Sequence, residues 1–147
     1  MESILIAIFY SILAGSFVAA QNVFSTKISE KIGMWETTVI VHLVGLIFAI
    51  ILALILGKGS YKGLGEVNKI YLLAGALGVI IIFSVTMGVS TLGASFAISL
   101  MVISQLTFST LIDAYGLFGM DKIPFNTTKL AGLIIMVIGL VVFKLKG

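Results

Sequence analysis

A stripe of polar side chains runs along an otherwise apolar segment between Gly93 and Gly119. At about 100° per residue, these side chains fall within roughly one third of a helix circumference. The polar stripe consists of Ser95, Ser99, Gln105, Ser109, Asp113 and Gly116. An amide and a carboxylate are costly in lipid unless they face protein or a water-filled cavity. The polar stripe therefore predicts a helix face that contacts other helices or a polar solute.

Within the polar stripe, Gln105 and Ser109 are the candidates for hydrogen bonds to a solute. Gln105 could instead join two helices, through a bond worth about 0.6 to 2 kcal/mol in membranes. Asp113 lies about one turn from the end of its segment. It is a candidate coupling or gating carboxylate, or a structural charge that stays ionised near Lys122.

Three further candidate binding residues lie in the first two apolar segments. Gln21 and Asn22 close the first segment, where their amides could satisfy exposed carbonyls or contact a ligand. His42 is of the side-chain type that changes charge near neutral pH, although a single histidine in a helix can equally be a packing residue. Trp35 is interpreted as an anchor at the membrane interface.

Composition identifies a membrane protein. The 147 residues are 60% hydrophobic and only 10% charged, with a mean hydropathy of +1.25, whereas soluble domains carry about 25% charged residues. The chain has no cysteine and one histidine, so we expect no metal site and no cofactor. All nine basic residues are lysines outside the apolar centres, which favours contact with lipid headgroups over nucleic acid.

Five apolar segments are long enough to cross a bilayer at about 20 residues per crossing. We place them at residues 3–25, 36–57, 70–87, 93–117 and 127–145, in a single membrane domain that covers 1–147. The 43 residues of 70–112 carry no charge; as one helix they would rise about 64 Å, twice the hydrocarbon thickness. They must therefore fold back, and 88–93 holds the best cluster of turn residues. A short polar loop is expected at 27–34.

Small residues recur at helical spacing in the second and fifth segments. Gly45 and Ala49 form a ridge of small residues, and Gly132 and Gly139 form a groove. Such surfaces let the backbones of two helices approach closely in a membrane. We therefore expect both to serve helix packing.

The lysines give no clear orientation. Five segments place five lysines on one side of the membrane (Lys58, Lys62, Lys69, Lys122 and Lys129) and four on the other (Lys27, Lys31, Lys144 and Lys146). Because lysines in short loops set orientation, the chain is expected to insert both ways and to pair with an inverted copy or an inverted homologue. The alternative is a single orientation fixed by a feature outside this count.

Several motifs resemble a known family. They are Gly15-Ser16-Phe17-Val18-Ala19-Ala20-Gln21-Asn22, Gly93-Ala94-Ser95, Ser104-Gln105-Leu106 and Leu111-Ile112-Asp113, together with Gly119, Pro124, Gly132 and Gly139. Over nearly the whole chain the sequence resembles the five-helix, half-size branch of the drug/metabolite transporter superfamily. The resemblance implies a multi-pass inner-membrane protein, related in architecture to small multidrug exporters. Those exporters depend on an acid in their first helix, and here no acid lies between Glu2 and Glu30.

We therefore predict an all-α integral membrane protein of five helices, one half of an inverted-repeat transporter. It would export a small polar or amphipathic solute by alternating access, as an antiparallel dimer surrounded by lipid. Two alternatives remain open: a dual-topology channel for a small ion, and a non-transporting membrane assembly partner. No glycine-rich phosphate loop, catalytic triad or paired carboxylate set is present, so we expect no enzyme.

Overall fold

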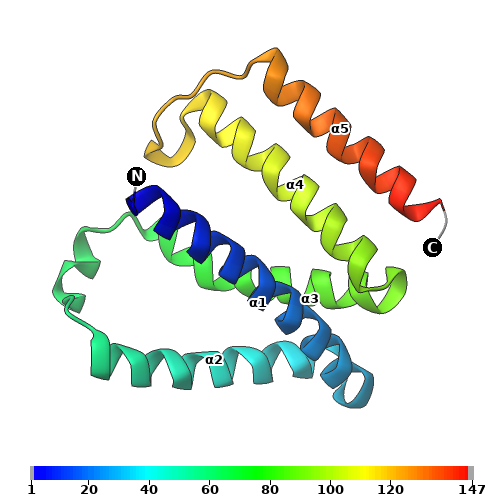
Figure 1. Ribbon diagram of the computed structural model, residues 1–147. Coiled ribbons are helices and arrows are strands. Elements are labelled where there is room, and N and C mark those ends of the chain that lie inside the picture. Colours follow the sequence, from blue (N-terminus) through cyan, green and yellow to red (C-terminus); the bar gives the residue numbers. More distant parts are fainter. Residues whose placement is uncertain (1, 146–147) are drawn as a thin grey trace. The chain divides into compact units, whose positions relative to one another are not determined.

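The structure, a computed structural model, describes residues 2–145 (Figure 1). It is built of five α-helices and three short 3₁₀ turns. The helices are α1 (Glu2–Ile32), α2 (Met34–Leu56), α3 (Ala74–Leu92), α4 (Ala94–Tyr115) and α5 (Thr127–Lys144); the turns are η1 (Tyr61–Glu66), η2 (Lys69–Leu73) and η3 (Leu117–Gly119). Within the described residues there is no strand. All five spans, of which the third includes η2, are long and apolar enough to cross a membrane, which confirms the predicted fold class.

The helices belong to two compact units. The first unit spans Met1–Thr91 and holds α1, α2 and α3, while the second spans Leu92–Gly147 and holds α4 and α5. Each unit is described separately below. Lys146, one of the lysines in the orientation count, lies outside the described residues.

A single glycine separates α1 from α2. The loop expected at 27–34 is helical up to Ile32, and the chain turns at Gly33, where φ is 95° and ψ is 162°. This backbone conformation is essentially restricted to glycine. The Gly33 carbonyl accepts hydrogen bonds from the backbone N–H and the hydroxyl of Thr37, at 3.1 and 2.6 Å, so α2 begins at once.

The same backbone geometry ends α3. We expected a turn over 88–93, but the helix continues to Leu92 and only Gly93 leaves it, with φ 81° and ψ 157°. Ser90 and Thr91 are helical, and their hydroxyls donate to the Met87 carbonyl, each at 2.9 Å, a bond that is tolerated inside helices. The predicted six-residue turn is therefore a one-residue turn.

The ends of α4 and α5 follow local capping rules. The Asn126 side chain accepts a hydrogen bond from the Lys129 N–H at 2.9 Å and so caps α5, as asparagine does at many helix starts. Gly116 ends α4 in the left-handed conformation, with φ 63°. The Asp113 carbonyl accepts from the N–H groups of Gly116 and Ile123, at 3.3 and 2.9 Å. These caps explain why both ends fall within two residues of the prediction.

Helix packing in the first unit brings α2 into contact with both of its neighbours. α1 packs against α2. The ring of Trp35 in α2 stacks on Phe83 of α3, with 4.2 Å between ring centroids, and His42 lies against Gly78. Since higher α2 numbers meet lower α3 numbers, these two helices are antiparallel.

In the second unit, α4 packs against α5. The Lys144 ammonium lies 4.5 Å from the centre of the Phe96 ring, a contact between a cation and an aromatic face. Most large apolar side chains of both units are exposed. Lipid solvates such side chains, so their exposure fits a membrane domain.

Candidate solute groove and polar residues

A groove of about 510 Å³ lies between α1 and α2 in the first unit. Its walls are aromatic and aliphatic, with two polar side chains. The lining includes Phe17, Gln21, Phe24 and Ser25 from α1 and Gly45 and Phe48 from α2. No charged residue lines the groove.

Helical spacing brings these α1 side chains to one wall. Residues three or four apart share a helix face, so Phe17, Gln21, Phe24 and Ser25 form a continuous strip. Opposite them, Gly45 contributes no side chain, and no atom lies within 4 Å of the position that its Cβ would occupy. Gly45 therefore leaves open space in the groove wall, and its expected role in packing against another helix remains a prediction.

The size and lining of the groove suit a small amphipathic molecule. Pockets for small ligands typically measure about 300–1,000 Å³ and combine apolar walls with a few polar groups. Here the phenylalanine rings provide flat apolar surface, and the Gln21 amide and Ser25 hydroxyl provide directional hydrogen bonds. Of the five predicted binding residues, this groove contains Gln21.

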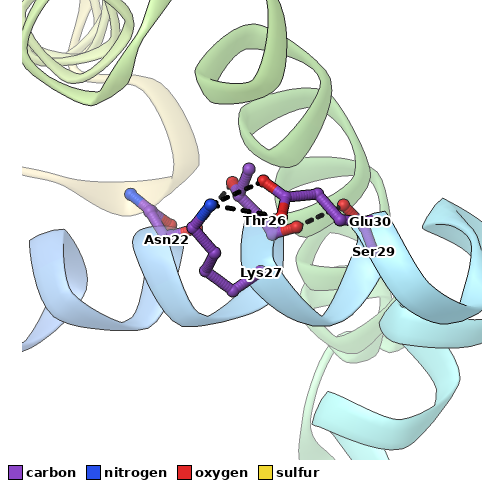
Figure 2. Close-up of polar contacts among 5 residues, drawn as sticks. All are labelled: Asn22, Thr26, Lys27, Ser29 and Glu30. Atoms are coloured by element: carbon purple, nitrogen blue, oxygen red, sulfur yellow. Dashed lines mark hydrogen bonds and ion pairs between the residues drawn. The ribbon is translucent and has the colours of Figure 1, made fainter.

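Asn22 is buried beside the groove-lining residues, only 8% exposed. Its carbonyl accepts a hydrogen bond from the Thr26 hydroxyl at 2.9 Å, and the Thr26 carbonyl accepts from the Ser29 hydroxyl at 2.8 Å (Figure 2). Its side-chain Nδ2, however, has no hydrogen-bond partner within the described residues. A buried donor left unpaired costs about 1–3 kcal/mol, so this amide has capacity for an acceptor such as water or a solute oxygen.

A cluster of buried threonines in the first unit was not anticipated from the sequence. Thr26, Thr37, Thr38 and Thr86 are each at most 6% exposed. The hydroxyls of the first three donate to carbonyls four residues earlier in their own helices. Threonine hydroxyls that bond to the backbone are tolerated inside helices. The pair Thr37-Thr38, close after Gly33, was the feature of the sequence that could have predicted such buried threonines.

His42 is half-buried on α2 and lies apart from the groove. Its Nδ1 is 2.8 Å from the Thr38 carbonyl oxygen. Its Nε2 lies toward α3, 3.2 Å from the position that a Cβ on Gly78 would occupy. The structure therefore places His42 between α2 and α3, whereas the groove lies between α1 and α2.

The polar stripe of α4 is divided in the second unit. Ser99 lines a separate groove of about 330 Å³ between α4 and α5, together with Gly139. Gln105 and Ser109 are exposed. Within the second unit, the structure therefore does not bring these two residues and Ser99 into one site.

Asp113 is half-buried near the end of α4. Lys27 and Glu30 form an ion pair at 2.8 Å (Figure 2). Among the described side chains, no ion pair involves Asp113. The Asp113 main-chain carbonyl caps the helix end. Its carboxylate is therefore not required for that cap, and its coupling or gating role remains a prediction.

Glycines 132 and 139 of α5 leave open space, with no atom within 4 Å of an added Cβ. Gly139 also lines the groove between α4 and α5, and the expected role of both glycines in helix packing remains a prediction. Among the described residues, no group of three or more His, Asp or Glu side chains is placed to hold a metal ion.

Five helices that are long and apolar enough to cross a membrane define a multi-pass integral membrane protein. Residues 6–142 match the family described as "Putative inner membrane exporter, YdcZ", within the drug/metabolite transporter superfamily. The chain belongs to this family and is a multi-pass inner-membrane transporter, which confirms the resemblance. A family of exporters is also in line with the expected lack of enzymatic activity. No match was found among curated proteins or solved structures.

Proposed function

We propose that the chain exports a small amphipathic solute that binds in the α1–α2 groove. The observation that carries this proposal is the groove itself, about 510 Å³ in volume and lined by phenylalanine rings, one amide and one hydroxyl. An uncharged lining favours a solute whose buried part is neutral, because an unpaired charge in an apolar site is costly. Gln21 and Ser25 orient the solute, and the rings hold its apolar part.

Export proceeds by alternating access between two inverted subunits. Transporters of this kind commonly place the solute site between inverted repeats. Two observations support a paired assembly here. The lysine split of five to four gives no orientation preference. The exposed Gln105 would be costly in lipid, and a second subunit, either a copy of this chain or a homologue, would offset that cost by covering it.

The test is solute binding by purified protein, screened by thermal shift, because a ligand that binds the folded state raises its apparent stability. Gln21→Leu should weaken binding of the solute found about ten- to a hundredfold, since it removes a hydrogen-bonding group worth about 1–3 kcal/mol. Phe24→Ala should weaken it as well. The matched control is Val23→Ala, on the same helix but outside the groove.

Two results would count against the proposal. The first is a solute whose dissociation constant is the same in wild type, Gln21→Leu and Phe24→Ala. The second is single-channel conductance without saturable exchange, which would favour the ion-channel alternative.

A further inference from the structure

His42 has a defined tautomer because of its contact with Thr38. A backbone carbonyl oxygen can only accept a hydrogen bond. The Nδ1 atom, 2.8 Å from the Thr38 carbonyl oxygen, must therefore carry the proton. In the neutral ring the other nitrogen, Nε2, then keeps its lone pair and is the atom that can bind a proton.

Nε2 lies at the contact between α2 and α3. A Cβ on Gly78 would lie 3.2 Å from it, which is tighter than ordinary van der Waals contact. A side chain at position 78 would therefore crowd the ring. No hydrogen bond to Nε2 is present within the described residues. The imidazole is therefore packed against a helix backbone, with its proton-binding atom unpaired.

Within the described residues, no hydrogen bond or ion pair joins an acidic side chain to His42. Helix α3 has no titratable residue. The other titratable residue of α2 is Glu36, six residues earlier and roughly 9 Å away along the helix axis. Helix α1, which packs on α2, carries Tyr10 in its apolar part and Lys27, Glu30 and Lys31 in its last two turns.

We propose that Nε2 of His42 is the proton-binding site that couples proton movement to the export cycle; this inference rests on the proposed function. A proton taken from water on one side of the membrane binds the Nε2 lone pair and gives an imidazolium. Nδ1–H keeps its bond to Thr38, while the new Nε2–H lies beside Gly78 within a membrane-spanning helix pair. A cation is costly in such surroundings. Protonation therefore favours a state in which α2 and α3 separate, and loss of the proton to the other side restores the contact.

The chain contains its own reporters for this step. It has one tryptophan and one histidine. Trp35 stacks on Phe83 across the same pair of helices, with ring planes 19° apart, so its fluorescence responds when α2 and α3 separate. The single imidazole gives one set of NMR signals that reports protonation directly.

The experiment is a pH titration of the full chain in lipid nanodiscs, without solute, from pH 8 to pH 5, where imidazoles change charge. In wild type, the Trp35 emission should shift together with the His42 signals. The shift should be lost in both His42→Asn, whose amide can keep the bond to Thr38, and His42→Gln. Glu36→Gln, which removes the titratable neighbour of Trp35, should keep it. Using two neutral variants allows for the failure of either one to fold.

Persistence of the Trp35 shift in a folded His42→Asn or His42→Gln protein would overturn the proton site, as would a His42 ring that does not titrate. Neither result bears on solute binding, which is measured separately with Gln21→Leu. In vesicles, an imposed pH gradient should drive accumulation of the solute by wild type and not by His42→Asn. Gradient-driven accumulation by His42→Asn would refute the coupling role while leaving the export function intact.

Discussion

At the scale of single residues, Gln105 poses the sharpest question. It is exposed on α4, whereas the groove shared by α4 and α5 takes Ser99 from the polar stripe. On a helical projection, Gln105 lies about 120° from Ser99. An amide on a lipid-facing surface is costly, so in the assembled membrane protein this surface contacts protein, water or solute.

Replacing Gln105 by Leu separates these possibilities. If Gln105 contacts solute, we expect solute affinity to fall about ten- to a hundredfold with little change in melting temperature, because a helix-joining hydrogen bond in membranes is worth under about 2 kcal/mol. Thermal-shift binding curves measure both quantities. Ser104→Leu, one residue earlier on another exposed face of α4, is the control and should leave affinity unchanged. A Gln105→Leu protein that melts earlier yet binds normally would assign Gln105 to helix association.

The sequence identifies polar residues within the helices but does not give their partners. The prediction that Gln21 and Asn22 close the first helix is wrong, because α1 continues to Ile32; the structure buries Asn22 inside the helix with an unpaired Nδ2. The buried threonines were missed because a hydroxyl that bonds its own helix leaves no sign in hydrophobic spacing. The close approach of His42 to Gly78 is a contact between helices, which periodicity along one helix does not contain.

At the scale of helices, the spans were predictable and two of the turns were not. Length and apolar composition were enough to find all five helices, and Asn126 marked the start of α5. The turns at 27–34 and 88–93 were overestimated because lysines, serines and threonines there suggested loops. In the structure their side chains are compatible with helix, and only Gly33 and Gly93 require a conformation that other residues avoid.

Gly93→Ala tests this one-residue turn. A φ of 81° is strained for alanine, at a cost of about 1–3 kcal/mol, while no atom lies within 4 Å of the new methyl group. Backbone strain alone should therefore lower the melting temperature of the purified protein. Gly75→Ala adds the same methyl group to open space on a helical residue of α3, so it should leave the melting temperature equal or slightly higher. Equal melting temperatures for Gly93→Ala and wild type would show that the turn tolerates alanine.

At the scale of the whole molecule, no single helix determines where solute would bind. The predicted site residues are distributed over both units, with Gln21, Asn22 and His42 in the first and Gln105, Ser109 and Asp113 in the second. Sequence periodicity gives the face of each helix but not its neighbour. In the proposed paired assembly, a partner covers the exposed Gln105 and the open Gly132 of α5, so orientation in the membrane is the property that tests this assembly.

Orientation is tested with two C-terminal reporter fusions. One reporter is active only on one side of the membrane, and the other is active only on the opposite side. The five-to-four lysine split predicts substantial signal from both reporters. Lysines at Gly59, Gly63 and Gly65, where an added Cβ meets no atom within 4 Å, should draw the 57–69 segment to the cytoplasm and leave one reporter active. Glutamines at the same three positions control for side-chain size and should keep both signals. A wild-type chain that activates one reporter alone would exclude pairing with an inverted copy of itself and would require an inverted homologue as the partner.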